Sequence, residues 1–338
     1  MGAREGVAVT GQTMRAAVCR KHGPPETLVV ESVPRPEPGP GEVLVRVGAA
    51  AVNFPDVLIV ADGYQVSVPT PFVPGSEVAG EVVALGRGVD GAGPGDMVFG
   101  ATMVGAFAEY VTLPAAGLMP IPPGVDVPAA AGFWVVYATA YHALRSVAEV
   151  QRGDWVVVLG AAGGVGLAAV DLAQVLGGRV IAAASTPRKL ALCRDRGAEH
   201  GVNYLDDDVR DAVRAIVPDG VDVVIDPVGG PASERALRSV RWGGRFVTVG
   251  FASGDIPRIP LNLVLLKGVI VKGFEIRTFG LHAPELAARD RAELLDLLAS
   301  GRVAPHIDGV YPLGDVAGAL RKVADRQSAG KVLVDPAR

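Results

Sequence analysis

The amino-acid sequence predicts an α/β protein in which a doubly wound parallel sheet is inserted into a β-rich domain. In the first third of the chain, short runs of β-branched residues alternate with proline and glycine turns, which is typical of a compact, barrel-like β domain. From Asp154 onward, strand and helix patterns alternate, as they do in the βαβ units that build a parallel sheet. The 338 residues suffice for two domains.

The elements follow from these patterns in chain order. The strands expected before the change of period include residues 14–19, 27–31, 42–51, 77–85 and 97–99. An apolar helix is expected at residues 129–147. The expected strands of the parallel sheet are 155–159, 179–184, 201–204, 221–226, 245–250 and 268–274. The helices between them are expected at 165–176, 187–196, 209–216 and 231–240, and a helix at 283–300 and a strand at 331–335 end the chain.

These elements predict the domain organisation. Residues 1–13 are polar and glycine-containing, and we expect a flexible N-terminal extension there. The β-rich catalytic domain is expected to comprise residues 14–135 and 276–338, so that it uses both ends of the chain. Residues 136–275 form the expected nucleotide-binding domain. A ligand cleft between the two domains is the expected site.

Composition excludes several classes of protein. With 49% hydrophobic residues and 20% charged residues, the chain can bury large cores and is not predominantly disordered. The net charge of −4 and the absence of a Lys/Arg block argue against a nucleic-acid partner or an anionic membrane surface. No apolar run reaches the about 18 residues of a membrane span. The two cysteines, Cys19 and Cys193, cannot form a disulfide framework or a zinc cluster, and we expect a cytoplasmic protein.

The most informative stretch begins with the strand Trp155–Leu159 and continues through a glycine-rich turn into an Ala/Leu-rich helix. This context makes a dinucleotide-binding fingerprint credible, although Ala161 occupies the first glycine position of Gly-x-Gly-x-x-Gly. Gly163 permits a sharp turn, Gly164 permits close approach of a pyrophosphate, and Gly166 permits tight packing of helix and strand. The N-terminus of the helix offers N–H groups and a positive dipole end to the phosphates.

The end of the second strand indicates which nucleotide is bound. An NAD-preferring site would place Asp or Glu about 20 residues after the glycines, on the ribose hydroxyls. Here the position holds Ser185 and Thr186, followed by Arg188 and Lys189. A 2′-phosphate needs hydroxyl donors and cations, which Ser185, Thr186 and Lys189 can supply. Arg188 either shares this task or points to solvent. The pattern favours NADPH over NADH.

Several motifs together resemble one family, the zinc-free medium-chain dehydrogenase/reductases in the NADPH:quinone oxidoreductase (zeta-crystallin-like) branch. The similarity runs from about Met14 to the C-terminus. The motifs that carry it lie at residues 52–56, 63–64, 74–80, 95–98, 105–110, 139–141, 161–166, 197–204 and 330–333. The resemblance implies a β-rich GroES-like domain, built as a partly open barrel, with an inserted Rossmann domain. It also implies a homodimer and hydride transfer from NADPH.

The resemblance also bears on zinc. Zinc-dependent relatives have a cysteine near position 53 and a Gly-His-Glu motif where this chain has Gly75-Ser-Glu77. Asn53 and Ser76 are poor zinc ligands, because zinc favours thiolate and imidazole. We therefore predict no metal. Without a Lewis acid, the natural acceptors are conjugated compounds, whose developing charge hydrogen bonds can stabilise.

The residues expected in the site fall into two groups. On the substrate side, Asn53 could donate its amide to a carbonyl oxygen or anchor the ribose, and Tyr64 could donate a hydrogen bond or a proton, or simply pack. On the cofactor side, the fingerprint, the strand ends and the resemblance indicate Thr139, Ala162, Gly163, Gly164, Val165, Gly166, Ser185, Thr186, Lys189, Tyr204, Val228, Gly250, Phe251, Ala252, Phe274 and Lys331.

Three functions remain open at this point. The first is reduction of a quinone by NADPH, and the second is NADPH-dependent reduction of an enal, enone or acyl thioester. The third is a non-catalytic NADPH-binding role. A small-molecule conjugated substrate is expected for the first two. A homodimer is expected because the apolar last strand at 268–274 lies at a sheet edge, which is either paired with a second copy or covered by a helix.

Overall fold

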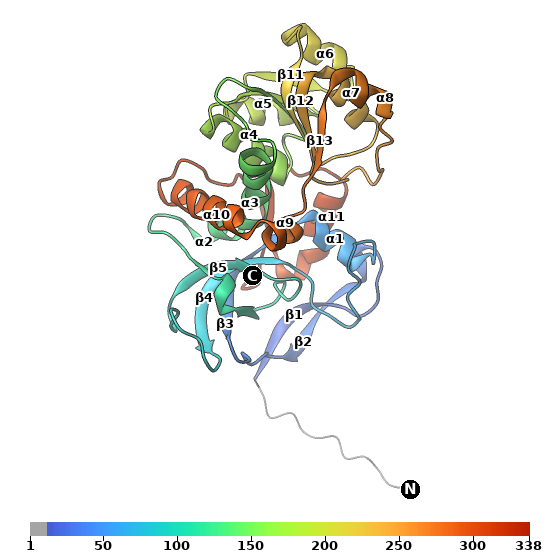
Figure 1. The fold of residues 1–338 in the computed structure, drawn as a ribbon. Coiled ribbons are helices and arrows are strands. Elements are labelled where there is room, and N and C mark those ends of the chain that lie inside the picture. Colours follow the sequence, from blue (N-terminus) through green and yellow to red (C-terminus); the bar gives the residue numbers. More distant parts are fainter. Residues whose placement is uncertain (1–11) are drawn as a thin grey trace. The chain divides into compact units, whose positions relative to one another are not determined.

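The computed structural model describes residues 12–338, in two compact units (Figure 1). The antiparallel-sheet unit comprises residues 12–121, Val310–Ala324 and Leu333–Arg338. The parallel-sheet unit comprises Pro122–Gly309 and Asp325–Val332. The expected extension over residues 1–13 lies almost entirely outside the described residues, because the described part begins at residue 12.

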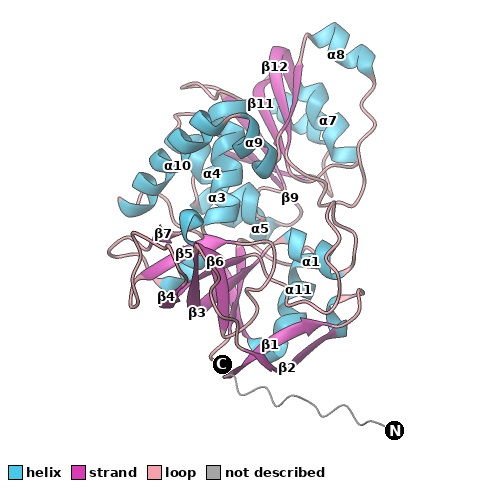
Figure 2. Cartoon of the chain, turned by 60° about the horizontal axis from the view of Figure 1, so that its bottom comes forward, coloured by secondary structure: helices cyan, strands magenta, loops and turns pink. Residues whose placement is uncertain are grey.

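The antiparallel-sheet unit is built on a seven-stranded sheet in the order β14-β15-β3-β4-β5-β7, with β6 paired to β3. Its strands are β3 (Glu42–Val52), β4 (Glu77–Leu85), β5 (Met97–Ala101), β6 (Tyr110–Pro114), β7 (Met119–Pro120), β14 (Ile307–Pro312) and β15 (Lys331–Asp335). A separate antiparallel pair consists of β1 (Thr13–Cys19) and β2 (Leu28–Pro34). Helix α1 (Phe54–Val60) packs against α11 (Val316–Ala324) (Figure 2).

The parallel-sheet unit contains six parallel strands in the order β10-β9-β8-β11-β12-β13. They are β8 (Trp155–Leu159), β9 (Arg179–Ala184), β10 (His200–Asn203), β11 (Val221–Asp226), β12 (Val240–Thr248) and β13 (Ile270–Gly273). The helices are α2 (Val127–Ala131), α3 (Trp134–His142), α4 (Gly164–Val175), α5 (Pro187–Asp195), α6 (Val209–Ile216), α7 (Pro231–Ser239), α8 (Leu261–Lys267), α9 (Ile276–His282) and α10 (Pro284–Ala299). The predicted fold class is confirmed.

The burial of the central strands explains why the alternation of strands and helices can be recognised in the sequence. Strands β8, β9 and β11 are runs of valine, isoleucine and alanine that are almost completely buried. Parallel strands covered on both faces lose the polar alternation of half-exposed strands, so they read as continuous apolar runs. Within residues 12–338, no helix combines the length and apolar character that crossing a membrane requires.

The unit boundaries differ from those expected at 135/136 and 275/276. Helix α10 belongs to the parallel-sheet unit, because the buried Asp290 carboxylate accepts hydrogen bonds from Ser146 and pairs with His142 of α3 at 2.9 Å. The expected helix at 129–147 is divided into α2, α3 and a single π-helical turn at Ala143–Val147. Helices α8 and α9 were not expected from the sequence.

Candidate active site

The glycine-rich turn between β8 and α4 has no room for a side chain at Gly166. A Cβ on Gly166 would lie 2.2 Å from the carbonyl oxygen of Gly160 and 2.8 Å from Cα of Ala161. Because both neighbours are backbone atoms, neither can rotate away. Gly163 caps α4, a helix of 12 residues whose first-turn N–H groups lie outside the helical hydrogen-bond ladder. These residues would fit a bound pyrophosphate, and its binding here stays a prediction.

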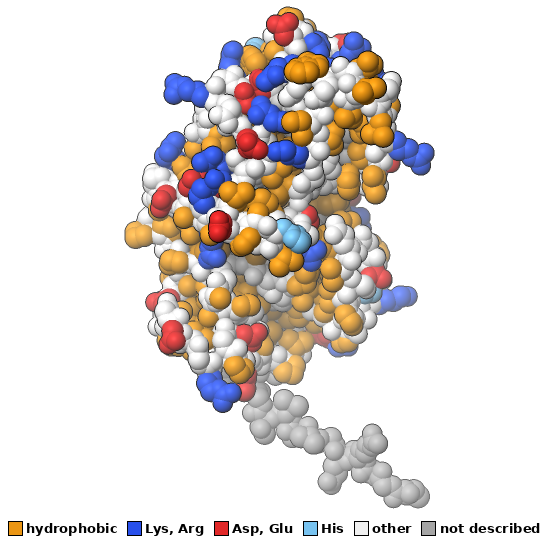
Figure 3. Space-filling view, in the orientation of Figure 1, with side chains coloured by type: hydrophobic (Ala, Val, Ile, Leu, Met, Phe, Trp, Pro, Cys, Tyr) orange, Lys and Arg blue, Asp and Glu red, His pale blue; other side chains and the backbone are white. Residues whose placement is uncertain are grey.

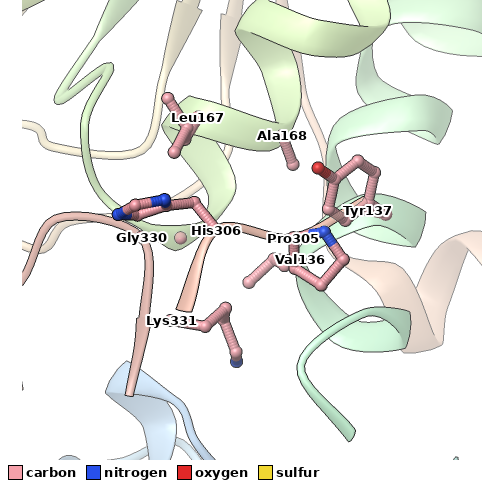
Figure 4. A pocket seen from close by; sticks show the side chains of 9 residues that line it. Val136, Tyr137, Leu167, Ala168, Pro305, His306, Gly330 and Lys331 are labelled. Carbon is pink, nitrogen blue, oxygen red and sulfur yellow. The ribbon is translucent and has the colours of Figure 1, made fainter. Parts of the chain in front are cut away.

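A second segment of the chain lies directly on this turn. The N–H of Gly330 donates to the Ala162 carbonyl at 2.8 Å, and the N–H of Lys331 donates to the His306 carbonyl at 2.8 Å. Figure 4 shows the small pocket at this point, with His306 and Lys331 beside the start of α4. The Lys331 side chain is 3% exposed, and its Cδ would lie 3.4 Å from a Cβ on Gly164. Lys331 therefore lies beside the glycine-rich turn, and its expected contact with a phosphate or ribose stays a prediction.

The residues after β9 form a cationic region. Thr186 caps α5, because its hydroxyl accepts the N–H of Lys189 at 3.2 Å. The Lys189 ammonium donates to the backbone carbonyl of Arg326 at 2.6 Å. Burial and the neighbouring charge of Arg188 lower the pKa of Lys189, whereas Asp308 opposes the shift. Arg188 is 82% exposed and lies 3.4 Å from Asp308.

Arg326 and Asp308 were not found from the sequence, because they lie more than 100 residues from Lys189 and neither belongs to a motif. Ser185, which was expected at the 2′-phosphate, and Tyr204, which was expected near the adenine or the 2′-phosphate, are both half-buried. The ring of Tyr204 packs against the apolar core of the parallel-sheet unit.

The loops that follow the neighbouring strands β11 and β12 lie against each other. Asp226 is fully buried, and its carboxylate accepts the N–H groups of Val228 at 2.8 Å and Gly229 at 2.9 Å. Burial raises the pKa of Asp226, although these hydrogen bonds act in the opposite direction. The N–H of Ala252 donates to the Pro227 carbonyl at 3.1 Å, which fixes the Gly250–Ala252 turn against β11.

Thr139 and Phe274, which were both expected to contact the cofactor, have different surroundings. Thr139 is half-buried on α3, the helix that packs against α4. Phe274 is 7% exposed, and its ring lies 6.0 Å from His142 and 5.5 Å from Phe279. This aromatic cluster holds the Phe274 side chain in the core, so any contact of Phe274 with a cofactor would be made by a small part of its surface.

In the antiparallel-sheet unit, Asn53 begins α1 at the end of β3. Its N–H donates to the Asp56 carboxylate at 2.7 Å, and its side-chain amide donates to Glu77 at 3.0 Å. All three residues are at most 5% exposed. An amide bonded to a carboxylate is not a set of donors that zinc favours. Within residues 12–338, no three His, Cys, Asp or Glu side chains are grouped as a metal site would require. A zinc-independent reaction stays a prediction.

Tyr64 lies in the loop after α1 and is half-buried. Its ring packs against an apolar cluster that includes Ile59, Val60 and Phe72. The ring therefore has a packing role, and a role of its hydroxyl in chemistry stays a prediction.

Comparison with known proteins gives consistent matches over nearly the whole chain. Residues 39–123 match the alcohol dehydrogenase GroES-like domain, and residues 164–299 match the zinc-binding dehydrogenase family. Quinone oxidoreductase-like protein 2 from Rattus norvegicus is 38% identical, over 95% of this chain and 91% of that protein.

Two solved structures are similar throughout. A mycobacterial protein in complex with NADPH is 34% identical, with a TM-score of 0.88, over 96% of this chain and all of that chain. A quinone oxidoreductase from Pseudomonas syringae is 30% identical, with a TM-score of 0.87, over 96% of this chain and all of that chain.

Proposed function

Because this chain belongs to the medium-chain dehydrogenase/reductase superfamily, in its quinone oxidoreductase-like branch, we propose that it uses NADPH to reduce a quinone. The observation that carries the proposal is the combination of the tight Gly163–Gly166 turn with a cationic, carboxylate-free end of β9. The turn suits a pyrophosphate, and the end of β9 suits a 2′-phosphate.

The charges around α5 support NADPH in particular. Arg188 and Lys189 lie in the first turn of this helix, after Pro187, and the two positions before the helix hold the neutral Ser185 and Thr186. An NADH site would place a carboxylate there for the two ribose hydroxyls, and that carboxylate would repel a 2′-phosphate. Asp308 offsets part of the positive charge through its 3.4 Å contact with Arg188. Arg188 and Lys189, the two cations in the first turn of α5, leave a net positive region for the phosphate.

A conjugated acceptor suits the donors of the antiparallel-sheet unit. When bound, NADPH supplies a hydride, and with one proton the quinone becomes a hydroquinone while the cofactor becomes NADP⁺. Glu77 holds the Asn53 amide in one orientation through its 3.0 Å hydrogen bond. We propose that Asn53 donates to the acceptor's oxygen, where negative charge develops. Hydrogen-bond donors fixed before the reaction stabilise such charge without reorganisation.

Tyr64→Phe tests whether the hydroxyl acts in the chemistry. If Tyr64 delivers the proton, we expect kcat to fall by about 100-fold or more with little change in the Michaelis constant for NADPH. The phenylalanine ring preserves packing against Phe72, so stability should change little. Tyr110→Phe is the matched control, since Tyr110 is also a half-buried tyrosine of the same unit. A Tyr64→Phe variant with wild-type kcat would leave Tyr64 a packing residue only.

The substrate is tested by following NADPH consumption with a 1,4-quinone and with a 2-enoyl thioester, side by side. We expect turnover with the quinone. Turnover confined to the thioester would instead assign the chain to the enoyl reductases. Tight NADPH binding without turnover of either acceptor would favour a non-catalytic NADPH-binding role.

We also propose that the chain forms a homodimer through the edge of its parallel sheet. Strand β13 is the last strand of that sheet, and its Ile270 and Val271 are 49% and 46% exposed. Hydrophobic side chains gather on the face that carries α8, at the upper right of Figure 3, where Leu265 and Leu266 are more than 70% exposed. Exposed apolar patches beside an unpaired edge favour association with a second copy.

Light scattering after size exclusion tests the dimer. We expect twice the mass of one chain for the wild type and the mass of one chain for Val271→Glu, because two carboxylates would face each other across the two-fold axis. Leu281→Glu, at an exposed residue of α9, is the control and should stay dimeric. A wild type of single-chain mass at micromolar concentration would refute the proposal.

A further inference from the structure

The His142 side chain at the end of α3 is held by a buried carboxylate. Its Nδ1 atom lies 2.9 Å from Oδ2 of Asp290 on α10, and the two residues are 4% and 0% exposed. Ser146 donates its hydroxyl to the same oxygen, and Nε of Arg289 donates to Oδ1 at 3.0 Å. Burial raises the pKa of Asp290, but these hydrogen bonds hold it below its ordinary value, so the carboxylate is ionised. Nδ1 of His142 therefore carries the hydrogen of this bond.

The imidazole ring of His142 also belongs to a cluster of three aromatic rings. Its centroid lies 6.0 Å from that of Phe274 and 4.8 Å from that of Phe279 on α9. The two phenylalanine rings are 5.5 Å apart and meet edge to face, which is a favourable arrangement. Helices α9 and α10 both lie beside α3 (Figure 2). The hydrogen bond to Asp290 fixes the His142 ring, and the ring in turn fixes Phe274.

Phe274 lies at the carboxyl edge of the parallel sheet. It follows β13 directly, and its N–H donates at 3.0 Å to the carbonyl of Thr248, the last residue of β12. The sheet order places β12 and β13 on one side of β8 and places β9 on the other. With the pyrophosphate after β8 and the 2′-phosphate after β9, as proposed, the nicotinamide half of the cofactor extends toward β12 and β13.

His142 is also close to a second residue expected at the cofactor. Thr139 lies three residues before it, about one turn earlier on α3. Helix α3 packs against α4, the helix that follows the glycine-rich turn. One buried side chain therefore connects Phe274, at the end of the sheet, with the helix that carries Thr139.

The chemistry of the pair suits orientation better than it suits stability. Burying an ion pair costs desolvation, and apolar residues of similar volume are often at least as stabilising. A hydrogen-bonded imidazole, in contrast, has one preferred orientation in its cavity, because any other would leave the buried Asp290 carboxylate without a donor. The pair thus holds its surroundings in a single arrangement.

We propose that His142 is a positioning residue for the nicotinamide half of the cofactor, and that Asp290 acts through it. The pair fixes the main chain at Phe274 and the turn of α3 that carries Thr139, without touching the cofactor. This inference rests on the proposed NADPH-dependent function. Breaking the pair should weaken the contacts to the nicotinamide half and leave those to the phosphates unchanged.

Asp290→Asn and His142→Gln test this role in the full chain. Dissociation constants are measured by calorimetry for NADPH and for 2′-phospho-ADP-ribose, which lacks the nicotinamide. Both variants should raise the constant for NADPH by about threefold or more, as expected for coupled residues in contact. The constant for 2′-phospho-ADP-ribose should stay within about twofold of the wild-type value, as expected for independent sites.

Asp154→Asn is the matched control. It also removes a carboxylate from a largely buried ion pair of the same unit, because Asp154 lies 2.7 Å from Arg245 and the two side chains are 13% and 16% exposed. Asp154 precedes β8, at the amino edge of the sheet, away from the proposed cofactor site. This variant should leave the ratio of the two dissociation constants unchanged.

A double variant separates positioning from folding. His142→Leu combined with Asp290→Val replaces the pair by apolar residues, which buried ion pairs often tolerate. Arg289 loses a partner, but its side chain is 39% exposed and can turn to water. The double variant should unfold cooperatively on heating and should still bind NADPH more weakly than the wild type does.

The ratio of the two constants distinguishes the possible outcomes. Equal weakening of both ligands in the single variants would make the pair a structural element of the whole unit, and unchanged constants would separate it from the cofactor. Either result overturns the proposal, as does wild-type NADPH affinity in a folded double variant. A wild type that binds neither ligand would instead refute the proposed function, and the positioning role with it.

Discussion

Gly166→Ala is expected to weaken NADPH binding by about tenfold or more. The added Cβ would lie 2.2 Å from the Gly160 carbonyl oxygen, a backbone atom that cannot rotate away. Helix α4 must then shift against β8, at a cost of about 1–3 kcal/mol for overpacking. The shift also moves the first-turn N–H groups away from the pyrophosphate position. Titration of cofactor fluorescence and thermal unfolding measure the two effects.

Gly280→Ala is the matched control for this prediction. Gly280 is also a helical glycine of the parallel-sheet unit, but a Cβ there would meet no atom within 4 Å. Alanine in a helix is favoured over glycine by about 0.5–1 kcal/mol, so this variant should be as stable as the wild type or more stable, with unchanged NADPH affinity. Wild-type NADPH affinity in Gly166→Ala would show that the phosphates do not lie at this turn.

Lys189→Ala is expected to weaken NADPH binding by about 10- to 100-fold, because a hydrogen bond to a charged group contributes about 1.5–3 kcal/mol. NADH lacks the 2′-phosphate, so its binding should become no weaker. Burial lowers the pKa of Lys189 below the usual lysine value. A neutral amine cannot pair with phosphate, so NADPH affinity should fall as the pH rises through that lowered pKa. Titrations of both cofactors across alkaline pH measure this.

Lys267→Ala controls for the loss of a half-buried lysine. Lys267 also donates to a backbone carbonyl, that of Val240 at 2.7 Å, and burial lowers its pKa as well. It lies at the end of α8, away from the residues proposed for the cofactor. This variant should keep the wild-type preference for NADPH. An equal loss of NADPH and NADH affinity in Lys189→Ala would place Lys189 outside the 2′-phosphate site.

Much of the parallel sheet could be predicted from the sequence, because its signals lie within short stretches of the chain. Strands β8 and β9 are short apolar runs that must be buried on both faces, and the glycine turn after β8 has a distinctive spacing. The boundaries of the units could not be predicted in the same way. Helix α10 joins the parallel-sheet unit because Asp290 meets His142 of α3, a contact across 148 residues that leaves no periodic signal.

The candidate site shows the same limit at the level of side chains. The motifs identified Asn53 and Lys189 by residue type. They could not show that Glu77 orients the Asn53 amide, or that the Lys189 ammonium rests on the Arg326 carbonyl. Phe274 was expected to end a strand, but β13 ends at Gly273, and the Phe274 ring packs against His142 and Phe279. Each of these facts depends on a partner distant in sequence, and residue type alone does not identify that partner.

The most direct test of the account compares kcat/KM for NADPH and for NADH with the same 1,4-quinone. The account predicts quinone-dependent oxidation of NADPH, with kcat/KM at least about tenfold higher than for NADH, the factor that 1.4 kcal/mol of preferential binding provides. Equal values for the two cofactors, a preference for NADH, or no quinone-dependent oxidation of either would contradict it.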